Sequence, residues 1–224
     1  MRVKILRKEA AGAPSFWQEF ECEAKPNQTV AGLLEALNGE DELKDVNGTK
    51  VSRIDWECSC LQGMCGACAM VINGEPALAC EVFLRDLKGE VVTVEPLRKF
   101  PVIRDLRVDR SIIYENLREA NAYIEEYEGS DPKEHDHQYA AGKCLKCGLC
   151  LEVCANYRKG EKFYGAAFAN DCYLINTRSS LHKDEIRESY KEHFASGCSK
   201  ALSCVDVCPM KIPTLASMAK LNRK

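Results

Sequence analysis

The sequence predicts an α+β protein of two domains, an N-terminal β-grasp domain over residues 1–100 and an all-α domain over residues 101–224. Strand-like segments predominate in the first part, and apolar residues with helical spacing predominate in the second. The cysteines divide at the same place, because one spaced group ends at Cys80 and the next begins at Cys144. A chain of 224 residues is long enough for two domains that each bury a core.

The first domain is expected to contain strands, one helix and a hairpin, in the order of a β-grasp fold. Residues 3–6 and 16–22 predict paired strands. Thr29 is a typical N-cap, and the apolar residues after it are spaced for a helix that ends near Gly39. Asn73-Gly74 predicts a tight turn within a hairpin over 70–80, because this dipeptide suits the positive φ angles of such a turn. Residues 91–95 predict the closing strand.

The second domain follows a connector bracketed by Pro96 and Pro101. A first helix is expected to end before Gly129, a second to end at Gly197, and a terminal helix to begin at Thr214. The polar residues 131–138, which include His135 and His137, are expected to form a solvated loop. The residues that carry the helical spacing are Ile113, Leu117, Ala120, Ile124 and Tyr127 in the first helix, and Ile186, Tyr190 and Phe194 in the second.

The composition excludes several classes of protein. Fourteen cysteines behind a charged N-terminus that lacks an apolar signal core indicate a reducing cytoplasm rather than an exported disulfide protein. No run approaches the roughly 18 apolar residues needed to span a bilayer, so membrane association must come through a partner. The net charge is -3, and no basic cluster with interleaved aromatics suggests nucleic acid.

The first cysteine group has the plant-type [2Fe-2S] spacing, C-x4-C-x2-C with a distant fourth cysteine. Gly63 and Gly66 let the loop fold over a cluster and bring N–H groups close to sulfur. The alternative is a zinc site, whose thiolates usually come as two separated pairs. Cys58 does not fit the spacing and is expected to be a free thiol. The predicted ligands are Cys60, Cys65, Cys68 and Cys80.

The second group consists of two runs of the bacterial ferredoxin type, C-x2-C-x2-C-x3-C-P. The first run has all four cysteines, although Ala155 stands in the place of the proline, and the second has Ala201 in place of its second cysteine. Seven thiolates therefore predict one [4Fe-4S] and one [3Fe-4S] cluster. Because the fourth cysteine of each run binds the cluster of the other, the two runs must meet in space. The predicted ligands are Cys144, Cys147, Cys150 and Cys208 for [4Fe-4S], and Cys154, Cys198 and Cys204 for [3Fe-4S].

The remaining candidates carry no chemistry in this interpretation. Cys22 and Cys172 stand outside every run and are expected to be small buried apolar residues. No Ser-His-Asp set, no pair of acid-base carboxylates and no phosphate-binding Gly-rich loop is evident. No catalytic residue is therefore predicted in this chain.

The order of these motifs resembles the iron-sulfur subunit of succinate dehydrogenases and fumarate reductases. The connector strengthens the resemblance, through Val94-Glu95-Pro96-Leu97, the segment 100–106 (FPVIRDL) and Val108-Asp109. The resemblance covers essentially the whole chain. It implies an electron-transfer subunit that passes single electrons between the FAD of a flavoprotein subunit and a quinone at a membrane anchor, which often carries haem b. The expected location is the cytoplasmic face of the cell membrane.

Some positions depart from the family pattern. Ubiquinone-reducing members tend to have a tryptophan after the position of Cys154 and a histidine beside that of Cys198, whereas this chain has Phe163-Tyr164 and Ser199. These departures favour menaquinone. One alternative is the iron-sulfur subunit of a soluble thiol- or heterodisulfide-linked fumarate reductase. An alternative of another class is a structural zinc-binding scaffold.

Overall fold

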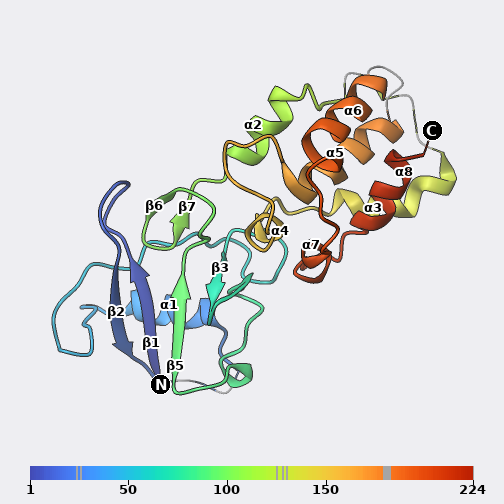
Figure 1. The fold of residues 1–224 in the computed structure, drawn as a ribbon. Helices are drawn as coiled ribbons and strands as arrows, with labels where there is room; N and C mark the ends of the chain where they lie inside the picture. Colours follow the sequence, from blue (N-terminus) through green and yellow to red (C-terminus); the bar gives the residue numbers. More distant parts are fainter. Residues whose placement is uncertain are drawn as a thin grey trace. The chain divides into compact units, whose positions relative to one another are not determined.

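The computed structural model describes residues 1–23, 25, 27–124, 126–127, 129, 131–178 and 183–223. It contains two compact units, Met1–Asp109 and Arg110–Lys224, which are described separately below (Figure 1). The first unit is built on a sheet and the second on helices, as the sequence predicts. The division falls after Asp109 rather than after Phe100, because the segment after Phe100 is tied to the first unit.

The first unit contains a mixed five-stranded sheet in the order β2-β1-β5-β3-β4. β1 is antiparallel to β2 and parallel to β5, while β3 is antiparallel to β4 and to β5. This is the β-grasp arrangement expected from the sequence. The turn between β3 and β4 has Asn73 at φ 49° and Gly74 at φ 85°, as a two-residue hairpin requires. The strands are β1 Arg2–Arg7, β2 Phe16–Glu21, β3 Ala69–Ile72, β4 Glu75–Leu78 and β5 Val91–Glu95.

Helix α1, Val30–Gly39, crosses one face of this sheet (Figure 1). Its predicted N-cap is confirmed, since Thr29 Oγ1 accepts a hydrogen bond from Gly32 N at 3.1 Å. The predicted apolar face is buried, with Leu33 and Leu34 fully inaccessible to solvent. The helix therefore closes the core over the sheet, and a single 3-10 turn, Leu84–Asp86, follows the hairpin.

A buried ion pair fastens the end of the first unit to β1. Arg7 Nη2 donates to Asp105 Oδ2 at 3.0 Å, and both side chains are almost fully buried. Asp105 Oδ1 and Oδ2 also accept from Lys8 N and Asp55 N. The small hairpin around Asp105, with β6 Val102–Arg104 and β7 Arg107–Val108, consequently belongs to the first unit.

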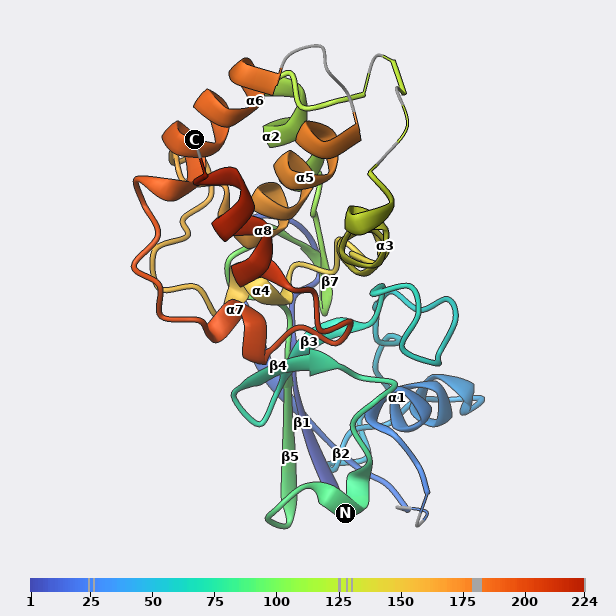
Figure 2. The ribbon, with the colours of Figure 1, turned by 90° about the vertical axis from the view of Figure 1, so that its right-hand side faces the viewer.

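In the second unit, α5 lies centrally and packs against α3, α6 and α8 (Figure 2). Within the described residues, no helix has the length and apolar character needed to cross a membrane. The elements are α2 Ile112–Glu119, a 3-10 turn Pro132–Glu134, α3 His135–Gly142, α4 Leu149–Glu152, α5 Gly165–Arg178, α6 Lys183–Tyr190, a π-helical turn Lys191–Ala195, α7 Ser203–Asp206 and α8 Thr214–Leu221.

Two predictions in this unit are wrong. Helix α2 ends at Glu119 rather than near residue 128, because Asn121 takes a left-handed conformation at φ 48°, and Ile124 and Tyr127 lie exposed beyond it. The expected loop at 131–138 is helical, because the Asp131 side chain accepts from Lys133 N and starts a helical turn. On that helix His135 is exposed, whereas the half-buried His137 lies 3.0 Å from Ser217 Oγ.

Two other helices agree with the sequence. The apolar residues Ile186, Tyr190 and Phe194 are each 1% exposed, on α6 and the π-helical turn that continues it. Gly197 follows, and a Cβ there would lie 2.7 Å from the Phe163 ring. The terminal helix begins at Thr214 as expected.

Candidate metal centres

The first cysteine group lies in the loop 60–68 and at the end of the β3–β4 hairpin. The hairpin register brings Cys68 and Cys80 side by side, with Ala79 N donating to Cys68 O at 3.0 Å. Their sulfur atoms are 3.4 Å apart and both residues are buried. Cys65 lies close enough to interact with the thiols of both Cys60 and Cys68. The structure therefore brings the four predicted ligands of this group together.

Backbone N–H groups of the loop point at these sulfur atoms. Gly63 N donates to Cys80 Sγ at 3.2 Å and Met64 N donates to Cys60 Sγ at 3.3 Å. The bend depends on Gly63, which has φ 74° and would place a Cβ 2.5 Å from the Glu81 carboxylate. Such donors stabilise negative charge on sulfur, as an anionic cluster requires.

Cys60 and Cys58 differ in the electrostatic environment of their thiols. Hydrogen bonds from the backbone, foremost from Gln62 N, lower the pKa of Cys60 to about 7. The pKa of Cys58 is raised instead, by partial burial and then by the nearby Glu35 and Cys65. The thiolate is the form that binds metal, and the backbone N–H groups of Gln62 and Met64 that point at Cys60 Sγ favour a thiolate there.

A second group of cysteines surrounds a cavity in the helical unit. Its other lining residues are mostly apolar, including Leu145, Leu149 and Ile212, and Ile212 N lies 3.5 Å from Cys208 Sγ. Four of the predicted ligands line this one cavity, namely Cys144, Cys147, Cys150 and Cys208.

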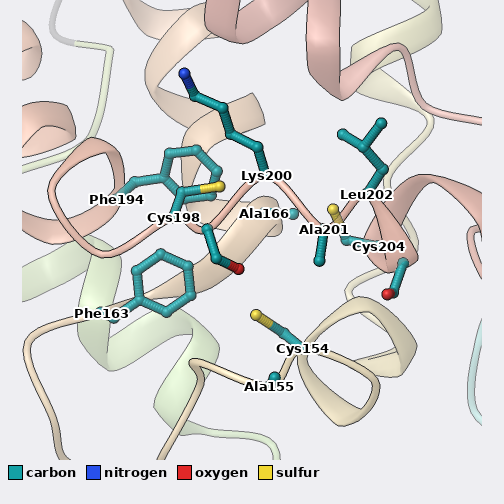
Figure 3. Close-up of a pocket in the computed structure, with 12 residues that line it drawn as sticks. Cys154, Ala155, Phe163, Ala166, Phe194, Cys198, Lys200, Ala201, Leu202 and Cys204 are labelled. Carbon is teal, nitrogen blue, oxygen red and sulfur yellow. The ribbon is translucent and has the colours of Figure 1, made fainter.

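The third group lines a separate cavity of the same unit. The sulfur atoms of Cys154, Cys198 and Cys204 face a common space, and the methyl group of Ala201 faces it as well (Figure 3). Phe163 and Phe194 form part of the wall. The structure thus separates the seven cysteines into a group of four and a group of three.

The short helices α4 and α7 explain this grouping. Cys150 lies on α4 and Cys154 just after it, while Cys204 lies on α7 and Cys208 just after it. The two helices contact each other and carry their cysteines in opposite order between the two cavities. Each helix is preceded by a left-handed residue, Gly148 at φ 87° or Leu202 at φ 64°. The two runs therefore have similar local geometry.

Burial disfavours the ionised form of the thiols in these two cavities when no metal is bound. It raises the pKa of Cys147 to about 11, raises that of Cys150 well above its usual value, and raises that of Cys204 as well. A bound cation reverses this cost, because thiolate coordinated to metal is deprotonated. The donor chemistry of both cavities consequently fits an iron-sulfur cluster. Among the described side chains, no three from His, Cys, Asp or Glu are arranged to hold a single ion.

Other residues make contacts near these cysteine groups that the sequence does not predict. Arg110 Nη1 donates to Cys147 O at 3.3 Å and so anchors the loop of the four-cysteine group. Lys146, within that loop, pairs with Asp171 of α5. Both contacts join residues that are distant in the sequence, so no local pattern predicts them. Of the remaining cysteines, Cys172 is fully buried as expected, whereas Cys22 is only half-buried.

Two family models match the chain. A 2Fe-2S iron-sulfur cluster binding domain matches residues 2–115, and a 4Fe-4S dicluster domain matches residues 140–212. The first contains the cysteines of the loop 60–68 and Cys80, and the second contains both runs of the helical unit. These matches assign [2Fe-2S] and [4Fe-4S] binding domains to the two parts of the chain.

Similar proteins match over nearly the full length. The succinate dehydrogenase iron-sulfur subunit of Bacillus subtilis is 33% identical over 100% of this chain and 91% of its own length. The fumarate reductase iron-sulfur subunit of Wolinella succinogenes is 29% identical, over 100% of this chain and 95% of its own length. An uncharacterized iron-sulfur protein of Methanocaldococcus jannaschii is 33% identical over 94% of this chain but only 41% of its own length.

The fold also has a counterpart among solved structures. A chain of the Mycobacterium smegmatis Sdh1 complex in the apo form aligns with a TM-score of 0.75 and 23% identity, over 98% of this chain and 94% of that one. The fold is therefore shared along the whole length of both chains. Together with the cysteine groups and the sequence relatives, this shows that the chain belongs to the family of succinate dehydrogenase and fumarate reductase iron-sulfur subunits.

Proposed function

We propose that this chain is the electron-transfer subunit of a succinate:quinone oxidoreductase or quinol:fumarate reductase. The observation that carries the proposal is the presence of three separate cysteine groups in one chain, two of which meet through contacting helices. Relatives named for both directions of the reaction match the full length. The chain contributes positions and electrostatics, and clusters bound in it would supply one-electron chemistry.

The proposed ligand sets follow the three groups. Ala201 has no donor atom, so the cavity that it lines offers three thiolates and is assigned a three-iron cluster. The mostly apolar walls of the two cavities in the helical unit would limit the access of water to clusters bound there. The sets are Cys60, Cys65, Cys68 and Cys80 for [2Fe-2S]; Cys144, Cys147, Cys150 and Cys208 for [4Fe-4S]; and Cys154, Cys198 and Cys204 for [3Fe-4S].

The proposed partners are a flavoprotein that holds FAD and a membrane anchor that holds quinone, here assigned as menaquinone, and sometimes haem b. The location proposed with these partners is the cytoplasmic face of the membrane. Direct attraction of its basic C-terminal end to anionic lipid is a weaker candidate for this attachment, because Lys220 is paired with Glu134 and Lys211 Nζ donates to Asp206 O at 3.3 Å. Lys224 lies outside the described residues. Protein contacts with the anchor are therefore proposed to hold the chain at the membrane.

One observation favours the second candidate, a soluble thiol- or heterodisulfide-linked fumarate reductase. The Methanocaldococcus relative extends well beyond the region that matches this chain. In an enzyme of the second kind, a thiol-disulfide module would take the place of the membrane anchor. The two candidates share the iron-sulfur chemistry and differ in their partners.

Purification of the chain under mild detergent from its own cells tests the proposal. We expect a brown complex that contains a flavoprotein and a multispanning protein, and EPR signals of three clusters that respond to succinate or to a quinol. A colourless protein with bound zinc would instead identify a structural scaffold. Co-purification with a cysteine-rich protein, and reduction or oxidation by a dithiol or disulfide, would identify the soluble enzyme.

A further inference from the structure

Lys146 and Asp171 form an ion pair at the edge of the four-cysteine cavity. Lys146 Nζ contacts both carboxylate oxygens of Asp171, and the two side chains are only 17% and 14% exposed. Lys146 stands between Cys144 and Cys147 and itself lines the cavity. Asp171 projects from α5, so a rigid helix fixes the position of the ammonium group.

The charge of Lys146 is stabilised where it lies. The carboxylate of Asp171, which the ammonium group contacts through both oxygens, compensates for the burial of this charge. The ammonium group therefore stays charged beside the cavity, in surroundings that screen charge less than water does. Arg110 is a further cation close to this loop, and it also interacts with Cys147.

The second run has a lysine at the equivalent position, in a different environment. Lys146 and Lys200 each lie two residues after the first cysteine of a run and both have positive φ, 54° and 59°. Lys200 is exposed, however, and water screens its charge. The two runs therefore allow a buried, paired lysine to be compared with an exposed lysine at the equivalent position.

We propose that Lys146 and Asp171 set the reduction potential of the cluster bound by Cys144, Cys147, Cys150 and Cys208 through opposed contributions. This inference rests on the proposed function and its ligand set. The ammonium group would raise the potential and the carboxylate would lower it, because reduction adds negative charge to the site.

The step concerned is the transfer of one electron. A four-iron core bound there would change from [4Fe-4S]2+ to [4Fe-4S]1+, and with four thiolates its net charge would change from -2 to -3. No bond forms or breaks and no proton is needed, so the charges on Lys146 and Asp171 act only on the energy of the added electron. In the titration described below, a soluble reductant supplies that electron through redox mediators.

Redox titration of the purified complex, monitored by EPR, tests the proposal. Lys146→Met should make reduction of the four-iron cluster about tenfold less favourable or more, which is 59 mV for one electron. Asp171→Asn should shift the potential by a similar amount in the opposite direction, since the ammonium is then unopposed. The double variant and Lys146→Arg should both remain near the wild-type value. Lys200→Met, the matched control, should change the potential of the three-iron cluster less than threefold.

Opposite shifts in the two single variants would support the proposal, because loss of a purely structural contact has no reason to change sign. Shifts of the potential in the same direction in both single variants, or changes in the reduction equilibrium of less than twofold, would overturn the proposal. That result would leave the ligand sets and the proposed function unaffected. If Lys146→Met assembles no cluster, Asp171→Asn alone tests the proposal. A potential higher than that of the wild type supports it, and a lower or unchanged potential overturns it. Loss of the cluster from every variant would also overturn it, by assigning the pair to assembly. A wild-type complex without a reducible four-iron cluster would overturn both this inference and the proposed ligand set.

Discussion

Ala201 is the residue that distinguishes the two cluster runs. Its methyl group faces the cavity that Cys154, Cys198 and Cys204 also face (Figure 3). A methyl group cannot bind iron, and the positions around it match those of the complete run, with Leu202 left-handed as Gly148 is. A single side-chain replacement is therefore expected to change the number of iron atoms that the site holds.

Ala201→Cys should convert the three-iron site into a four-iron site. EPR of the air-oxidised protein should show loss of the three-iron signal, and iron analysis should show a higher iron content. Ala155→Cys is the matched control, since Ala155 lines the same cavity but lies outside the C-x2-C positions of the run. A three-iron signal that persists in Ala201→Cys at full strength would contradict the role assigned to this position.

Cys58 and Cys60 provide a second test at the level of single residues. Backbone donors favour the thiolate of Cys60, whereas the pKa of Cys58 is raised. Cys60→Ser should therefore abolish or strongly alter the visible and EPR spectra of the two-iron cluster, and Cys58→Ser should leave them nearly unchanged. The reverse result would show that the spacing rule selects the wrong first ligand.

The approach of α5 to α4 depends on one glycine. Gly165 begins α5 at φ 80°, and a Cβ there would lie 2.2 Å from Cδ2 of the buried Leu151. Gly142, at the end of α3, has open space around it and no positive φ. The two positions therefore separate the effect of a close approach from the ordinary effect of glycine in a helix.

Gly165→Ala should lower the stability of the helical unit by about 2 kcal/mol or more, through backbone strain and overpacking. Gly142→Ala should be neutral or stabilising by roughly 0.5–1 kcal/mol. Thermal unfolding of both variants under anaerobic conditions measures the difference. Equal unfolding midpoints in the two variants would mean that Leu151 and α5 move apart at little cost.

At the level of elements, the sequence is informative where the determinant is local. The Thr29 cap, the Asn73-Gly74 turn and the burial of the predicted apolar faces of α1 and α6 all follow from neighbouring residues. The end of α2 does not, because the apolar spacing continues past Asn121 although the chain there turns left-handed. The helix over 135–142 is not expected from the sequence because its residues are mostly polar, and its partners, Tyr173 and Ser217, come from distant helices.

The same distinction between local and distant determinants applies to the candidate sites. Cysteine spacing predicts which cysteines lie together, and the structure groups them in that way; that they bind clusters stays a prediction. It could not predict the Lys146–Asp171 pair or the Arg110 contact, because packing of helices brings those residues together. The boundary between the units was also displaced, since the Arg7–Asp105 pair joins residues at opposite ends of the first unit.

For the whole molecule, the two units should respond differently to loss of iron. The first has a sheet and a core with fully buried side chains such as Val3, Ile5 and Phe20. In the second, α4 and α7 are helices of four residues, which are too short to be stable alone. Crosswise binding of clusters would join these two segments, so metal binding contributes directly to their folding.

Removal of iron by oxidation and chelation should therefore loosen residues 144–154 and 198–208 first. Hydrogen exchange followed by mass spectrometry should show their amide protection lost, while β1 and β5 remain protected. The intact complex kept reduced and anaerobic is the control. Protection that stays unchanged in the cysteine runs would show that the helical unit needs no metal to hold them.

The buried Asp105 determines where the first unit can be cut free. Excision after Phe100 would remove the carboxylate and leave the Arg7 guanidinium with neutral partners, namely Gln18, the Ser52 hydroxyl and the backbone of residues 52–53. Loss of one member of a buried ion pair costs roughly 3–5 kcal/mol, a large part of the stability of a domain this size. A fragment that ends at Asp109 keeps the pair and the N–H bonds to Lys8 and Asp55. The two-iron unit is thus separable at the later point, although sequence composition marks the earlier one.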